Sequence, residues 1–204
     1  MLLAKGYAQE VVKAGEIPNT MMKKFNSLCH EMEKDPKAEI KMIYLLSMIA
    51  ELIQETPKVN FPFNRKFLQS VFLIDDELLE TSPYRKRILA VLGVIYENAS
   101  RQAKLLKKLD MVHQFKASVL TNYHIVEESF SARLFNKSLY NLTVQGESLT
   151  EAELHKYGVF ESIARFMGVE QSELLIQKLK TALVRLNAKN CQLQVKTVIA
   201  SGDC

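Results

Sequence analysis

The chain has few of the residues on which common catalytic and metal sites depend. Its 204 residues include no tryptophan, three cysteines, five prolines and seven glycines. With so little glycine, and with no GxSxG, GxGxxG or Walker A pattern, the sequence provides neither a phosphate-binding loop nor a nucleophile elbow. It also has no HExxH or ExxH pattern, which are the usual zinc-protease and di-iron motifs. We therefore predict a protein that is not an enzyme and that binds no cofactor and no metal.

The cysteines and the apolar segments indicate the cellular compartment of the protein. Cys29, Cys191 and Cys204 are odd in number and far apart, so we expect free thiols in a reducing compartment rather than disulfides or a zinc site. The first residues do not resemble a signal peptide. The most apolar windows, 42–53 and 88–96, fall short of the ~20 residues that a membrane span needs. We expect no membrane span and a cytoplasmic location.

The sequence does contain several signals for the starts of helices. Asp35-Pro36 and Ser82-Pro83 each combine an N-cap residue with a proline in the first helical turn, and Thr150 and Glu153 have the spacing of a capping box. Apolar residues recur after these signals at three- and four-residue spacing. The expected helices are 2–14, 20–34, 36–54, 64–80, 83–109, 111–121, 125–138, 150–167 and 170–188, with one or two of them merging.

Two of these helices have apolar faces that bear on function. On the helix over 36–54, a broad apolar face includes Ile40, Ile43, Tyr44 and Leu46, with Lys37, Lys41, Glu51 and Glu55 on the other side. The helix over 20–34 has a methionine-rich face, made of Met21, Met22, Phe25, Leu28 and Met32. That face is either part of the core or an adaptable peptide groove.

Two segments depart from helical periodicity. Residues 139–145 and 191–199 alternate in polarity and contain β-branched side chains, which predicts two short strands that pair with each other. One edge of so small a sheet would stay unpaired, and a partner could add a strand there. Val195 and Val198 are therefore candidate partner-binding residues. The alternative is that residues 190–204 form a frayed tail.

Together these signals predict a mainly α fold. We expect an irregular bundle of about seven to nine helices with the small β element at 139–145 and 191–199. A chain of this length usually folds as one domain, here 1–204. Residues 1–56 form a candidate N-terminal subregion, and residues 150–188 a C-terminal helical hairpin.

Positive charge is concentrated in the middle of the chain. The net charge is +4, and residues 61–120 account for all of it with ten basic and six acidic side chains. If 83–109 is one helix, three of these basic residues share a face. The cluster is either a solvated surface that complements a helix dipole, a docking surface for an acidic protein, or a surface for the phosphate backbone of nucleic acid. The candidate binding residues are Arg85, Lys86, Arg87, Arg101, Lys104 and Lys108.

One short segment resembles a helix-turn-helix. Residues 163–174 place a small residue, a glycine four positions later, an apolar residue directly after it and another apolar residue five positions further on. The matching residues are Ala164, Gly168, Val169 and Leu174, with Met167 at the apolar position before the glycine. The resemblance implies a recognition helix from Glu170 that exposes Gln171, Ser172, Glu173 and Gln177. Because this helix starts with two carboxylates, a structural hairpin is the alternative.

The sequence as a whole favours a non-enzymatic helical adaptor, chaperone-like protein or scaffold subunit that acts by protein–protein contact within a larger complex. The alternatives are a DNA-binding transcription regulator that uses residues 163–178, and a sequence-independent nucleic-acid binder that uses the basic face over 85–116.

Overall fold

The computed structural model describes residues 5–32, 35, 37–74, 79, 81–123, 125–145 and 149–201, with side chains from Tyr7 to Lys189 apart from Ser129. Within these ranges the chain forms eleven helices and no strand. The mainly α fold is confirmed, with more helices than predicted. The helices are α1 (Lys5–Ala14), α2 (Glu16–Glu31), α3 (Lys37–Glu55), α4 (Arg65–Phe72), α6 (Arg85–Ser100), α7 (Ala103–Lys108), α8 (Val112–Tyr123), α9 (Ser129–Val144), α10 (Glu151–Lys156), α11 (Val159–Phe166) and α12 (Val169–Ser201).

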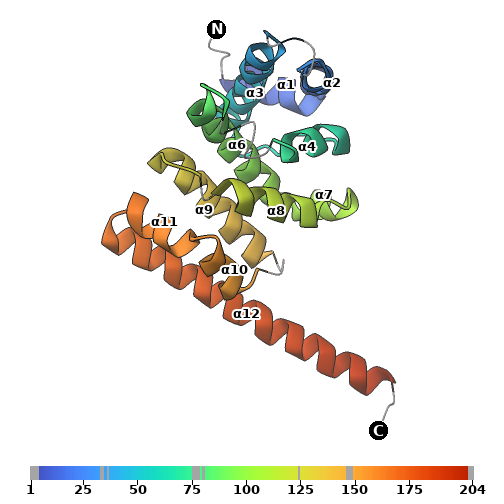
Figure 1. The fold of residues 1–204 in the computed structure, drawn as a ribbon. Coiled ribbons are helices and arrows are strands. Elements are labelled where there is room, and N and C mark those ends of the chain that lie inside the picture. The colour runs from blue at the N-terminus through green and yellow to red at the C-terminus, as the bar shows by residue number, and fades with distance from the viewer. Residues whose placement is uncertain are drawn as a thin grey trace.

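The helices stack roughly in chain order, from α1–α3 at one end of the molecule to α10–α12 at the other (Figure 1). Helices α2, α3, α6, α9 and α12 each pack against the next in this series, and the contact of α6 with α9 is the most extensive. One hydrophobic cluster runs through the stack, with Phe25, Leu46, Tyr96, Phe135 and Leu179 among its fully buried members.

Helix starts follow the predicted caps at several places. The Asn64 side chain accepts a hydrogen bond from the Phe67 amide at 2.9 Å and begins α4. At α10 the capping box is complete, because the Glu153 amide donates to Thr150 Oγ1 at 3.1 Å and the Thr150 amide donates to Glu153 Oε2 at 2.8 Å. Such caps satisfy amide groups that lack a partner within the helix. The capping signals at Asn64 and Thr150 therefore mark genuine helix starts, whereas α6 begins at Arg85, two residues after the predicted start at Pro83.

The predicted start of the second helix, at residue 20, is wrong. The helix begins at Glu16, directly after Gly15, which adopts a left-handed conformation with φ of 76°. The Asn19 amide donates to the carbonyl of Gly15 at 2.9 Å. Pro18 is tolerated inside the first turn because an amide there has no intrahelical acceptor. A single residue thus separates α1 from α2.

Two predicted helices are each divided in two. The prediction over 83–109 divides into α6 and α7, and the prediction over 150–167 divides into α10 and α11. In the second case the cause is Gly158, whose φ of 61° ends one helix and begins the next. That backbone conformation is available to glycine at little cost.

The strand predicted over 139–145 is wrong, because these residues belong mostly to α9. Leu139 and Leu142 are both completely buried three positions apart, which is helical rather than strand spacing. The Thr143 hydroxyl donates to the carbonyl of Leu139 at 3.0 Å, one turn back. Tertiary packing therefore overrides the β-propensity of this segment.

The strand predicted over 191–199 is also wrong, because the backbone there continues α12 to Ser201. Neither glycine nor proline interrupts the sequence from Val169 to Ser201. The helix is anchored earlier by its buried leucines, and adding residues to an existing helix costs far less than starting one. With 33 residues α12 is about 50 Å long, and its C-terminal part projects past the other helices (Figure 1).

The lengths and hydropathies of the helices agree with the prediction that no segment spans a membrane. In the part of the chain that the structure describes, every helix is too short or too polar to cross a lipid bilayer.

Candidate docking surfaces

The three basic residues that begin α6 separate into two groups. Arg85 is half-buried; its guanidinium donates to the carbonyl of Ile125 at 3.1 Å and lies 3.8 Å from a Glu127 carboxylate oxygen. Lys86 lies 4.0 Å from the other Glu127 oxygen. Both contacts go to the connection between α8 and α9. Arg87 instead turns toward α3, where its Nε donates to Ser47 Oγ at 3.1 Å.

The side chain of Arg101 is bound to other parts of the folded chain. It lies at the C-terminal end of α6, 3.2 Å from Glu97 Oε2, and donates to the carbonyl of Pro57 at 2.5 Å. These contacts fasten the loop before α4 to α6. The contacts of Arg101 therefore indicate a structural role.

The predicted single face of Arg101, Lys104 and Lys108 does not form, because the helix breaks at Gln102. At the break, the carbonyl of Ser100 accepts a hydrogen bond from Gln145 Nε2 at 2.6 Å, and the amide of Ala103 donates to Gln145 Oε1 at 3.2 Å. One side chain from the end of α9 thus satisfies both backbone groups that the break would leave unpaired. Lys104 and Lys108 remain together, exposed on α7.

Part of the apolar face predicted for α3 is exposed, which the sequence did not predict. Ile40, Tyr44 and Met48 follow one another at four-residue spacing, so they share a face, and they are 40%, 59% and 54% exposed. Arg87 lies over this stripe, with its guanidinium carbon 5.3 Å from the centroid of the Tyr44 ring. We call these four residues the Tyr44–Arg87 surface.

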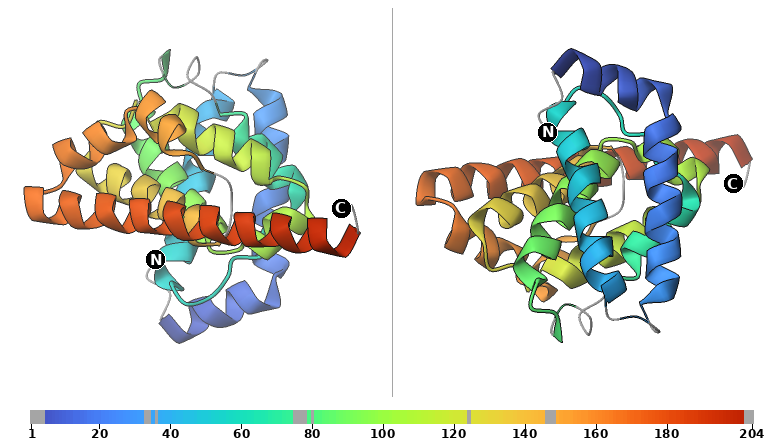
Figure 2. Two further views of the ribbon diagram at one scale, coloured as in Figure 1. Left: turned by 90° about the horizontal axis from the view of Figure 1, so that it is seen from below. Right: turned by 90° about the horizontal axis from the view of Figure 1, so that it is seen from above.

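Helix α3 is at the outer face of the molecule, as the view from above shows (Figure 2). A signal for the stripe was present in the sequence, since the predicted apolar face of this helix was broad, and α1, α2 and α6 cover only part of it. The fully buried Leu46 and Ile49 mark the side of the helix that packs inward.

The methionine-rich face of α2 belongs to the core. Met22, Phe25 and Leu28 are almost completely buried, and the Phe25 ring packs edge-on against Phe67 at 5.1 Å. Cys29 beside them is a free thiol, as predicted. Burial raises its pKa to about 11, opposed in part by a backbone hydrogen bond, so very little reactive thiolate forms near neutral pH.

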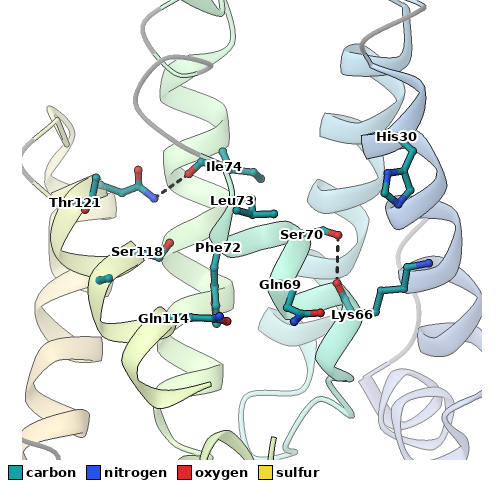
Figure 3. A pocket seen from close by; sticks show the side chains of 12 residues that line it. His30, Lys66, Gln69, Ser70, Phe72, Leu73, Ile74, Gln114, Ser118 and Thr121 are labelled. Atoms are coloured by element: carbon teal, nitrogen blue, oxygen red, sulfur yellow. Dashed lines mark hydrogen bonds between the residues drawn. The ribbon is translucent and has the colours of Figure 1, made fainter. Parts of the chain in front are cut away.

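A recess of about 550 Å³ opens between α2, α4 and α8 (Figure 3). Gln69, Gln114 and Thr121 give it a polar lining, and Leu73 is exposed beside them. Among the described residues that line it, His30 and Lys66 are the ionisable ones. Neither forms an ion pair or side-chain hydrogen bond with the rest of the described chain. The described residues also include no cluster of three or more His, Cys, Asp or Glu that could hold a metal.

The segment that resembles a helix-turn-helix does form two helices, α11 and α12, joined at Met167 and Gly168. Its packing differs from what the resemblance implies. Leu174, which the pattern places in the core, is 57% exposed, and Val169 is 73% exposed. Ala164 is exposed as well. Ser172, which would face DNA, is buried and donates to the carbonyl of Val169 at 2.8 Å.

Val195 and Val198, the remaining candidates, lie on the helical backbone of α12, and their side chains are outside the described residues. No protein family model, no curated protein and no solved structure matches this chain.

Proposed function

We propose that this chain is a non-enzymatic helical adaptor that docks a protein partner through the Tyr44–Arg87 surface. The observation that carries the proposal is the stacking of Arg87 on the exposed ring of Tyr44, next to Ile40 and Met48. Tyrosine, arginine and methionine are enriched in protein–protein interfaces, where aromatic and arginine side chains provide much of the binding energy.

The charges around the stripe indicate the chemistry of the partner. Lys37 and Lys41 are exposed at the start of α3, where Lys41 lies 3.8 Å from Asp35 Oδ2, and Arg87 lies at the middle of the helix. A segment that carries an apolar side chain next to carboxylates fits this surface, because the apolar group covers the stripe and the carboxylates face the cations. Arg87 is held in place by Ser47 and Tyr44, so little side-chain entropy is lost when it binds.

Photo-crosslinking in cells of the native host tests the proposal. We expect p-benzoylphenylalanine at position 48 to trap a discrete protein after nuclease treatment, because this position faces outward from the stripe. The yield should fall at least tenfold in Arg87→Glu and in Tyr44→Ala. Arg165→Glu is the matched control, since Arg165 is also exposed and lies 5.9 Å from an aromatic ring centroid, that of Phe166.

A crosslink whose yield is the same in Arg87→Glu and Arg165→Glu would contradict the adaptor proposal. The nucleic-acid alternative makes a different prediction. In that case nucleic acid co-purifies before nuclease treatment, and Lys104→Glu with Lys108→Glu removes it with a steep dependence on salt.

A further inference from the structure

A second surface lies at the other end of the molecule, in a groove of about 450 Å³ between α9 and α12. These two helices lie side by side in Figure 1 and pack against each other. Thr143, Ala182 and Leu186 line the groove and are buried. Val144 from α9 and Leu174 from α12 line it too, but they are 51% and 57% exposed. The groove therefore has an apolar base and two uncovered apolar side chains.

Among the described residues that line this groove, the ionisable side chains are cationic except for the phenol of Tyr140. Lys178, Arg185 and Lys189 come from α12, and all three are exposed. None of them forms an ion pair or hydrogen bond with the described part of the chain. Lys180 shows the contrast: it faces the other side of α12, 3.1 Å from Glu151 Oε1 and 5.5 Å from the centroid of the Phe160 ring.

The sequence of α12 adds to the positive charge of this groove. After Glu173 the helix has no acidic residue, whereas Lys and Arg recur along it. Cations near the C-terminus of a helix complement its dipole, but that effect is confined to the last turn. Lys178 and Arg185 are about six turns and about four turns from Ser201, so the dipole does not account for them.

We propose that this groove binds an acidic amphipathic helix of a partner protein. The helix would place an apolar side chain between Val144 and Leu174 and its carboxylates opposite Lys178, Arg185 and Lys189. The cations span eleven positions of α12, or about 16 Å, which three turns of a partner helix match. The two exposed apolar side chains favour a peptide over a nucleic-acid backbone. A peptide can cover them with apolar side chains, whereas phosphate groups make only polar and ionic contacts.

This proposal is independent of the Tyr44–Arg87 surface, which belongs to α3 and α6. If both hold, the protein presents two docking surfaces of similar chemistry at opposite ends of the helical stack. That arrangement suits an adaptor that holds two partners at once.

Selection from a phage-displayed library of helical peptides, each about four turns long, tests the groove directly. The library is first depleted on the Lys178→Glu/Arg185→Glu double variant and then selected on the intact protein. We expect the enriched peptides to combine Asp or Glu with Leu, Ile or Phe at three- and four-residue spacing. Binding of a fluorescent enriched peptide should weaken at least tenfold in Arg185→Glu and at least threefold in Leu174→Ser.

Matched controls separate this result from the other surface and from loss of folding. Arg165→Glu and Tyr44→Ala should leave the peptide affinity unchanged, and Arg185→Lys should retain most of it. Thermal melts of Arg185→Glu should match those of Arg165→Glu, since both side chains are exposed. The proposal is overturned if no peptide is enriched, if enriched peptides lack carboxylates, or if a single-stranded DNA 20-mer binds more tightly than the peptides and loses affinity in Arg185→Glu.

Discussion

Individual side chains of the same type have very different roles in this molecule, and their surroundings explain why. Arg101 is held between Glu97 and the carbonyl of Pro57, whereas Arg87 stacks on an exposed ring. Tyrosines differ in the same way. Tyr44 is mostly exposed, while Tyr96 is completely buried, with its hydroxyl 2.7 Å from Ser118 Oγ and 3.0 Å from Asn122 Nδ2.

The burial of Tyr96 predicts a loss of stability at alkaline pH. Burial raises the pKa of Tyr96 to about 12 from its ordinary 10, although the hydrogen bonds with Ser118 and Asn122 lower it in part. Between pH 10 and 12 the unfolded chain therefore releases a proton that the folded protein retains, so the free energy of unfolding falls as pH rises. Urea unfolding at successive pH values measures this slope.

The variant Tyr96→Phe should show a shallower fall in that pH range, and Tyr44→Phe should keep the full slope because its ring is exposed. Burial raises the pKa of Tyr123 as well, so some dependence remains in Tyr96→Phe. An identical slope in Tyr96→Phe and the unmodified protein would show that Tyr96 does not titrate in this way.

At the scale of the elements, the crossing of α6 and α9 organises the fold. A Cβ atom at Gly93 would lie 3.1 Å from the Cβ of Leu134, so glycine lets the two helices approach closely. The end of the same helix pair is fastened by Gln145, which also satisfies the break between α6 and α7. One close contact and one side chain thus set the geometry of three helices.

We expect Gly93→Val to lower the free energy of unfolding by about 1–3 kcal/mol, because a branched side chain overpacks this crossing. Gly168→Ala is the matched control. A Cβ atom there meets nothing within 4 Å, but Gly168 is the N-cap of α12, where alanine is less favourable than glycine. The stiffer unfolded chain opposes this cost, so we expect the free energy of unfolding to change by less than about 1 kcal/mol. Chemical denaturation measures both, and equal stability of the two variants would contradict the close approach.

At the scale of the whole molecule, the hydrophobic cluster extends from Val11 on α1 to Leu183 on α12. The proposed N-terminal subregion 1–56 shares it, since α3 packs against α6. Polar contacts cross the same boundary, because Ser82 Oγ donates to Glu39 Oε1 at 2.5 Å. The first three helices therefore bury their inner faces on later parts of the chain.

We expect a fragment of residues 1–60 to lack a cooperative fold, because it would leave the inner face of α3 uncovered. The intact chain should unfold in one transition, with circular dichroism and tyrosine fluorescence coinciding. Far-UV circular dichroism of the fragment and the dispersion of its amide proton chemical shifts in NMR spectra test whether it folds. A sharp thermal transition in the fragment would instead establish residues 1–56 as a separate unit.

The sequence by itself determined the features that depend on neighbouring residues. Capping residues and three- to four-residue apolar spacing predict the helical class and the starts of α4 and α10, because a cap satisfies amides only two or three positions away. The composition likewise predicted the free thiol at Cys29. The same local logic failed at 139–145, where β-branched residues suggested a strand.

Tertiary structure decided the features that depend on distant residues. Gln145 is more than forty positions from the break it stabilises, so local periodicity joined α6 and α7 into one helix. The exposed stripe on α3 and the groove between α9 and α12 have the same origin. Which side of an apolar helix stays uncovered is set by the helices that pack against it, and the pairing of helices is a property of the folded chain.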